Sequence, residues 1–187
     1  MTSGTKLETS EQIDVTFSVP MEPKAKARAV PVKAGRYVRM VKDRGTRQWE
    51  ATLAQIAALH LPEKVIENNV RVDVLAVLTR PAYMRKKNRK GEYKFGTGLL
   101  MCGKRPDIDN LRKSVMDALK PFWVDDCLVV DGRTVKCYAE LDGRARVVVR
   151  IRSTEVSLDD GFLSELEVSG GPRDGSQEEA QDGQRDD

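Results

Sequence analysis

A group of carboxylates and one lysine near the middle of the chain carries the residue types that could do chemistry. Asp107 and Asp109 stand two residues apart where a helix is expected to begin, and Lys113 follows Asp109 by four residues. A spacing of four places both side chains on one helix face. A second acidic pair, Asp125 and Asp126, lies downstream. Hard cations such as Mg²⁺ take oxygen ligands and usually keep several waters, so two or three carboxylates suffice to bind one.

The chemistry that such a site supports is hydrolysis of a phosphate ester. A bound divalent metal can generate hydroxide and stabilise the charge that builds on the phosphate. A lysine beside it can neutralise that charge or protonate the leaving oxygen. A structural alternative stays open, because Asp at a helix start is ordinarily a cap and Asp-Asp before a strand is ordinarily a turn.

The distance that the chain must cover decides whether Asp126 can join Asp107 and Asp109. A helix over 107–119 is about 18 Å long at ~1.5 Å per residue. The segment 120–126 reaches roughly 23 Å at ~3.3 Å per residue. Asp126 therefore returns to the helix start only if this segment runs back nearly extended. The other possibility is that it joins the site across a dimer, and the sequence leaves both open.

Composition excludes most other chemistries. His60 is the only histidine among 187 residues, so Ser-His-Asp catalysis and histidine metal sites are disfavoured. The three cysteines, Cys102, Cys127 and Cys137, contain no Cys-x-x-Cys pair, which argues against a disulfide framework or a zinc knuckle. No apolar run approaches the roughly 20 residues of a membrane span, and no signal peptide is evident. We expect a soluble cytoplasmic protein that has no membrane partner.

The net charge of +3 averages two unlike regions. Residues 1–153 hold 30 basic and 18 acidic side chains, a net charge of +12. Residues 154–187 hold 2 basic and 11 acidic side chains, a net charge of −9. The basic region can attract a polyanion such as nucleic acid, and the acidic tail can compete with that polyanion.

The most basic segment is 80–105, where nine cations stand against one acid and aromatic residues are interleaved. Its glycines argue against a regular helix and favour a long loop or a loose hairpin. Long loops in compact domains are usually functional or disordered. We predict that cations here contact DNA phosphates while aromatic rings stack on bases. The predicted DNA-binding residues are Lys24, Arg85, Lys86, Lys87, Arg89, Lys90, Lys104 and Arg105.

Hydrophobic periodicity predicts the elements that would position these residues. We predict strands at 14–19, 70–78, 127–138 and 145–151, and helices at 48–59 and 107–119. The segment 24–47 is expected to be a basic loop with a short strand around Tyr37. The fold class is therefore α+β in two layers, with a mixed sheet of about four strands packed against two main helices.

Composition also divides the chain into three parts. Residues 1–12 are expected to be a flexible N-terminus, residues 13–152 one folded domain, and residues 153–187 an acidic, disordered tail.

Several motifs together resemble the RusA family of Holliday junction resolvases. They are Arg105-Pro-Asp-Ile-Asp-Asn-Leu-Arg-Lys113, Asp117-Ala-Leu119, Trp123-Val-Asp-Asp126 and Val129-Val-Asp131. The opening Val19-Pro-Met-Glu-Pro23-Lys24 and the Val-rich strand at 146–151 also fit, so the resemblance spans about 13–152.

The resemblance implies a small homodimeric nuclease that nicks four-way DNA junctions symmetrically with Mg²⁺ or Mn²⁺. It implies that Asp107, Asp109, Asp126 and Lys113 are catalytic and that the three aspartates hold the metal. It places the protein in the cytoplasm of a bacterial cell or of a phage-infected host.

Two alternatives to a junction resolvase stay open. One is a metal-dependent nuclease that acts on forks, flaps or RNA. The other is a non-catalytic DNA-binding protein in which Asp107 and Asp109 only cap a helix. The chain also departs from the family pattern, because Pro106 stands directly before the first aspartate and the basic segment 80–105 is long. These departures leave the substrate preference open.

Overall fold

The computed structural model describes residues 12–27, 30–41 and 43–154. The chain divides into two units, 1–155 and 156–187, and every described residue belongs to the first. The predicted flexible N-terminus and acidic tail lie almost entirely outside the described residues, so both stay predictions.

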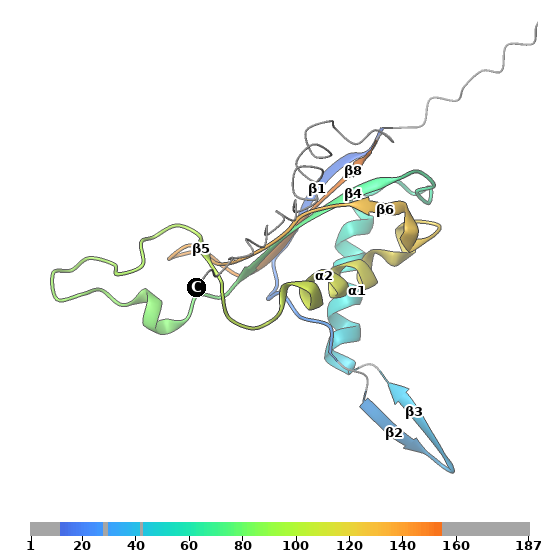
Figure 1. The fold of residues 1–187 in the computed structure, drawn as a ribbon, viewed down its shortest axis with the longest axis horizontal. Coiled ribbons are helices and arrows are strands. Elements are labelled where there is room, and N and C mark those ends of the chain that lie inside the picture. The colour runs from blue at the N-terminus through green and yellow to red at the C-terminus, as the bar shows by residue number, and fades with distance from the viewer. Residues whose placement is uncertain (1–11, 28–29, 42, 155–187) are drawn as a thin grey trace, which may run out of the picture. The chain divides into compact units, whose positions relative to one another are not determined.

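A mixed six-stranded sheet forms one layer of the fold (Figure 1). Its strands are β1 (Asp14–Val19), β4 (Val70–Leu78), β5 (Leu100–Met101), β6 (Val129–Asp131), β7 (Thr134–Tyr138) and β8 (Arg146–Ser153). The order is β1-β8-β4-β7-β5, and β6 pairs with β4. Strand β4 runs antiparallel to β8 and parallel to β7. The predicted α+β class is confirmed; β5, with two residues, is too short for period-2 alternation to reveal it.

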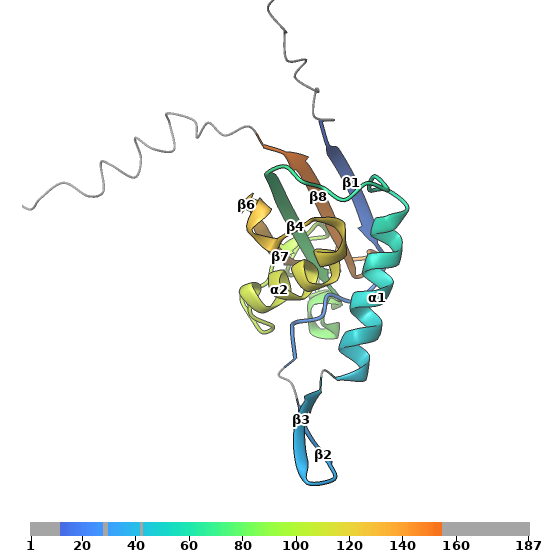
Figure 2. The same cartoon turned by 90° about the vertical axis from the view of Figure 1, so that its right-hand side faces the viewer.

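Two helices, α1 (Arg44–Ala58) and α2 (Ile108–Leu119), cover one face of this sheet (Figure 2). Alternation along the strands sends every second side chain toward the helices, where it is buried. The fully buried side chains of this core include Val19, Leu53, Val72, Leu119, Val149 and Ile151. In the described part of the chain, none of the helices has the length and apolar content that crossing a lipid bilayer requires.

The basic segment before α1 differs from the prediction. Helix α1 begins at Arg44, four residues before the predicted start, because the Asp43 carboxylate accepts a hydrogen bond from Thr46 N at 3.0 Å and caps the helix. The loop predicted upstream contains a complete hairpin, β2 (Val30–Ala34) and β3 (Tyr37–Val41). Cations interrupt the apolar alternation of these strands, so the pattern revealed only the neighbourhood of Tyr37.

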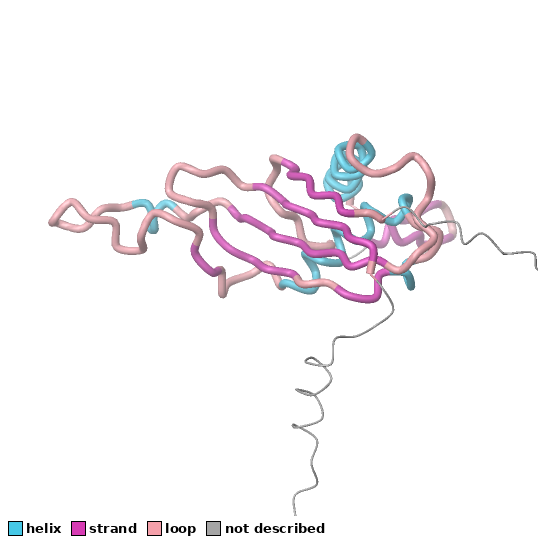
Figure 3. The backbone as a smooth tube through the Cα atoms, turned by 90° about the horizontal axis from the view of Figure 1, so that it is seen from above, coloured by secondary structure: helices cyan, strands magenta, loops and turns pink. Residues whose placement is uncertain are grey.

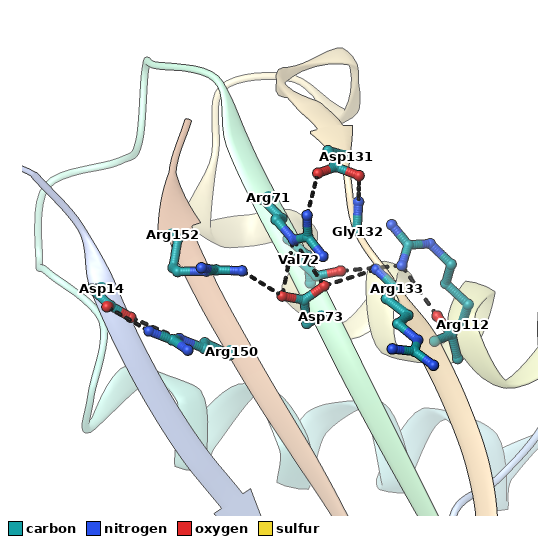
Figure 4. A network of polar contacts seen from close by, with 11 residues as sticks. Asp14, Arg71, Val72, Asp73, Arg112, Asp131, Gly132, Arg133, Arg150 and Arg152 are labelled. Atoms are coloured by element: carbon teal, nitrogen blue, oxygen red, sulfur yellow. Dashed lines mark hydrogen bonds and ion pairs between the residues drawn. The ribbon is translucent and has the colours of Figure 1, made fainter. Parts of the chain in front are cut away.

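The sheet face opposite the helices carries a network of ion pairs (Figure 4). The Asp73 carboxylate on β4 accepts hydrogen bonds from Arg71 Nε at 3.0 Å, from Arg152 Nη2 on β8 at 3.0 Å and from Arg133 N at 2.8 Å. Burial alone would raise the pKa of Asp73, but these donors outweigh it and lower the pKa to about 2. Asp73 therefore ties three neighbouring strand segments together on the outer face.

Replacing Asp73 with Asn tests this network. Because its folded pKa of about 2 lies below the ordinary 3.8, Asp73 stabilises the fold above about pH 4 and loses that contribution as the pH falls toward 2. We expect Asp73→Asn to lower the free energy of unfolding at pH 7 by about 1–3 kcal/mol. Urea denaturation from pH 7 to pH 2.5 should show this difference shrink. A difference that is constant over that range, or equal to that of the exposed control Asp142→Asn, would contradict the assignment.

Candidate active site

The start of α2 presents two exposed carboxylates. Asp107 occupies the position that caps the helix, yet its side chain makes no capping hydrogen bond; only its backbone oxygen accepts, from Leu111 N at 3.1 Å. Asp109 lies within the first turn, and its side chain is 60% exposed. The alternative in which Asp107 serves only as a helix cap therefore finds no support in the geometry.

Lys113 shares the helix face of Asp109, as its spacing predicted. Its Nζ lies 3.2 Å from Asp109 Oδ2. The hydrogen bond and the positive charge of Lys113 lower the pKa of Asp109, so this carboxylate is ionised at neutral pH. An anion and a cation thus stand together at the helix surface, where both are accessible.

Both aspartates line an open cavity of about 460 Å³ between the start of α2 and strand β7. Lys136 on β7 also lines it, and its Nζ donates to the backbone oxygens of Lys104 at 2.6 Å and Pro106 at 2.7 Å. Lys136 therefore fixes the turn that leads into Asp107. Lys136 is not among the predicted site residues, although a lysine between the apolar Val135 and Cys137 of a strand is unusual.

A close approach between β4 and the end of β6 positions α2. Arg112 on α2 donates from Nη1 to Val72 O and to Thr134 Oγ1, both at 3.1 Å. Gly132 has a φ of 150°, and a Cβ there would overlap the Val72 carbonyl oxygen. Only glycine lets the chain pass this strand so closely. The interruption at Gly132 thus divides the predicted strand 127–138 into β6 and β7 and leaves Val72 O open to Arg112.

Asp126 lies away from this cavity. Its carboxylate accepts from Trp123 Nε1 and from Lys120 Nζ, each at 3.1 Å. Lys120 directly follows α2, a 12-residue helix about 18 Å long, so Asp126 lies near the end opposite Asp107 and Asp109. Among the described residues, no group of three acidic, histidine or cysteine side chains is placed to hold a metal ion. One chain therefore does not bring the three predicted metal ligands together.

Asp125, the first member of the acidic pair, stabilises a turn. Its Oδ1 accepts from Cys127 N at 2.9 Å, which lowers the pKa of Asp125. The structural alternative for an Asp-Asp pair before a strand is thus confirmed for this residue.

The segment 80–105 forms the predicted loose hairpin, seen as the long loop beyond the sheet in Figure 3. It contains a short 3₁₀ turn at Ala82–Arg85 and an isolated bridge between Lys87 and Tyr93. The predicted DNA-binding residues of this segment are all exposed: Arg85, Lys86, Lys87, Arg89, Lys90, Lys104 and Arg105. Lys24 differs, since its Nζ is ion-paired with Asp43 at 3.2 Å.

Arg80 is the exception among the cations of this segment, because it is 1% exposed. Its guanidinium donates to Ala139 O at 2.8 Å, to Gly96 O at 2.9 Å and to Gly98 O. These carbonyls belong to the returning half of the loop and to the end of β7. Arg80 therefore fastens both halves of the basic loop to the sheet and is not available to DNA.

A profile of the family described as "Endodeoxyribonuclease RusA" matches residues 20–152. This range contains the sheet from β4 onward, both helices, the paired aspartates and the basic loop, so the match covers the candidate site as well as the fold. The chain belongs to the RusA family, and the predicted family is confirmed.

Curated relatives agree with this assignment. "Uncharacterized protein YqaN" of Bacillus subtilis (strain 168) is 32% identical over 137 residues, which cover 73% of this chain and 95% of YqaN. "Crossover junction endodeoxyribonuclease RusA" of Escherichia coli (strain K12) is 44% identical over 48 residues, which cover 25% of this chain and 40% of that protein.

Replacing Arg80 with Met tests whether it anchors the basic loop. The change leaves buried carbonyls without donors, which costs about 1–3 kcal/mol of local stability. We expect hydrogen exchange to accelerate roughly 10- to 100-fold at the Leu141 amide, which bonds to Thr97 O at 2.8 Å across the loop. Replacing the exposed Arg85 with Met is the matched control. Equal exchange rates in the two variants would show that Arg80 is not the anchor.

Proposed function

We propose that this chain is a metal-dependent DNA endonuclease that resolves four-way junctions by paired, symmetric nicks. The observation that carries the proposal is the pair of exposed carboxylates, Asp107 and Asp109, with Lys113 at 3.2 Å from Asp109 in a chain of the RusA family. The printed name of the Escherichia coli relative, a crossover junction endodeoxyribonuclease, supports a four-way junction as the substrate.

The donor set at the start of α2 fits a hard divalent cation, Mg²⁺ or Mn²⁺. Asp107 and Asp109 offer carboxylate oxygens only, and helix capping does not occupy the Asp107 side chain. Such cations prefer oxygen ligands and retain waters, so an open, solvated site suits them. When bound, the cation would supply an activated hydroxide and neutralise charge on the phosphate.

The remaining residues of the cavity bind and orient the substrate. Lys113 is placed to exchange the carboxylate of Asp109 for a phosphate oxygen and to protonate the leaving oxygen. Lys136 keeps the backbone before Asp107 in place through its bonds to Lys104 O and Pro106 O. The exposed cations of the basic loop, anchored by Arg80, hold the DNA backbone beside the cavity.

A homodimer is the assembly that this chemistry requires. A four-way junction has two-fold symmetry, so two nicks made in one binding event need two sites held in one particle. Asp126 lies beyond the far end of α2 from Asp109, which is separated from that end by about 15 Å of helix. We therefore propose that the partner subunit's Asp126 completes each three-carboxylate site.

Replacing Asp109 with Asn tests the catalytic assignment. The loss of one anionic ligand should reduce junction cleavage by about 10²–10³-fold or more, while binding persists or tightens because repulsion of phosphate is relieved. Cleavage of a labelled junction with Mg²⁺ and with EDTA measures the first effect, and an electrophoretic shift measures the second. The exposed Asp142→Asn is the matched control. Full cleavage by Asp109→Asn would refute the site.

A substrate panel separates the proposal from its alternatives. The same enzyme is given a junction, a fork, a flap, a duplex and an RNA hairpin. Preferred cutting of the fork or flap would favour the broader nuclease. Binding without metal-dependent cutting of any substrate would favour the non-catalytic DNA-binding protein.

Mixing two inactive variants tests the shared site. In a dimer that contains one Asp109→Asn chain and one Asp126→Asn chain, a site shared between subunits is intact on one side and doubly changed on the other. The mixture should then nick one strand of the junction, although each variant alone is inactive. Sites built within single chains would leave both damaged. Absence of nicking by the mixture, with heterodimers shown by differential tags, would therefore exclude the shared arrangement.

A further inference from the structure

The β2–β3 hairpin projects from the body of the described unit (Figures 1 and 2). It carries exposed apolar side chains. The exposed fractions are 78% for Tyr37, 66% for Val38, 65% for Met40 and 47% for Val32. A two-stranded hairpin is at best marginally stable in water without a partner for its faces. The turn at Gly35, whose φ is 64°, keeps the two strands in a tight ribbon. This ribbon presents a surface that a binding partner would complete.

The charges of the hairpin indicate what kind of partner fits. Residues 30–41 contain Lys33, Arg36 and Arg39 and no acidic residue, a net charge of +3. Val32 pairs with Arg39 and Lys33 pairs with Val38, so each face of the ribbon sets a cation beside an apolar side chain. The hairpin of a second copy would bring like charges together, which is unfavourable. A polyanion with flat apolar surfaces between its charges matches both features.

Contacts on the chain before the hairpin fix its base to the candidate active site. Lys24 Nζ pairs with Asp43 at 3.2 Å, which joins the segment before the hairpin to the cap of α1. Lys26 Nζ pairs with Asp117 on α2 at 2.8 Å, and Lys26 N donates to Asn110 O at 3.0 Å. Asn110 directly follows Asp109, so the segment before the hairpin contacts the first turn of α2, which carries the proposed catalytic carboxylates.

We propose that the β2–β3 hairpin inserts into the major groove of a DNA arm beside the cavity. A two-stranded ribbon fits the major groove, which is about 12 Å wide. Lys33, Arg36 and Arg39 contact the flanking phosphates, and Tyr37 and Met40 contact the exposed edges of the bases, including thymine methyl groups. The proposal rests on the proposed function in taking DNA as the substrate, and it adds a second contact that holds one duplex arm in register with the site.

The salt dependence of junction binding tests the phosphate contacts. We compare the full chain with Arg36→Ala/Arg39→Ala and with the control Lys64→Ala/Arg144→Ala, which removes the same charge from exposed positions elsewhere. Losing two phosphate contacts should reduce the slope of log K against log salt by roughly 1.8. Between about 50 and 200 mM salt, the hairpin variant should lose roughly 12-fold less affinity than the unaltered chain. Thermal melting checks that both variants fold.

Dimethyl sulfate footprinting of the same complexes tests which groove is occupied. The unaltered chain should protect guanine N7 atoms, which lie in the major groove, and the hairpin variant should lose that protection. The inference is overturned by an unchanged salt slope, by protection confined to adenine N3 in the minor groove, or by a change of oligomeric state in the variant alone. Failure of the unaltered chain to bind and cut the junction counts against the proposed function, whereas normal cutting and an unchanged slope in the variant count against the hairpin alone.

Discussion

The packing of the start of α2 against β4 and β7 is the constraint on which the candidate site depends. Arg112 bonds to Val72 O and Thr134 Oγ1, and Gly132 makes room at the same carbonyl. Lys136 then holds the incoming turn through two backbone oxygens. These bonds are made by the side chains of Arg112 and Lys136, so the carboxylates of Asp107 and Asp109 are not needed to hold the start of α2 in place. Asp107 and Asp109 therefore remain exposed, and of these two only Asp109 has an ion-pair partner among the described residues, Lys113.

The elements that carry long periodic patterns could be predicted from sequence, whereas those set by tertiary contacts could not. The apolar stripe of α2 and the alternation in β1, β4 and β8 each repeat over several residues. The helix and sheet layers, and the pairing of Asp109 with Lys113, could therefore be predicted from the sequence. The burial of Arg80 depends on three distant carbonyls, which no local pattern encodes. The separation of Asp126 from Asp109 depends on its bonds to Trp123 and Lys120 after the helix ends.

The cations of the chain fall into two groups, those that are ion-paired on the sheet and those that are exposed on the basic loop. On the outer sheet face, cations such as Arg150 and Arg152 are paired with Asp14 and Asp73, so they stabilise strand packing and offer little to a polyanion. On the basic loop the cations are exposed, and some lie over aromatic rings, as Lys104 does at 5.7 Å from Tyr83. The net charge of +12 for residues 1–153 is therefore unevenly distributed. Ion pairs neutralise much of the positive charge on the outer sheet face, whereas the positive charge of the basic loop is exposed.

This division explains why a carboxylate site can operate on a phosphate backbone at all. Two aspartates repel a polyanion, so the substrate must be held by cations that the aspartates do not neutralise. Lys24 and Lys26 are already paired with Asp43 and Asp117, and Lys113 is paired with Asp109. Under the proposed function, the attraction comes from the exposed basic loop and hairpin, while Lys24 and Lys26 set the local geometry and Lys113 acts at the phosphate. Binding and chemistry then fall on different residues, and each can be changed without removing the other.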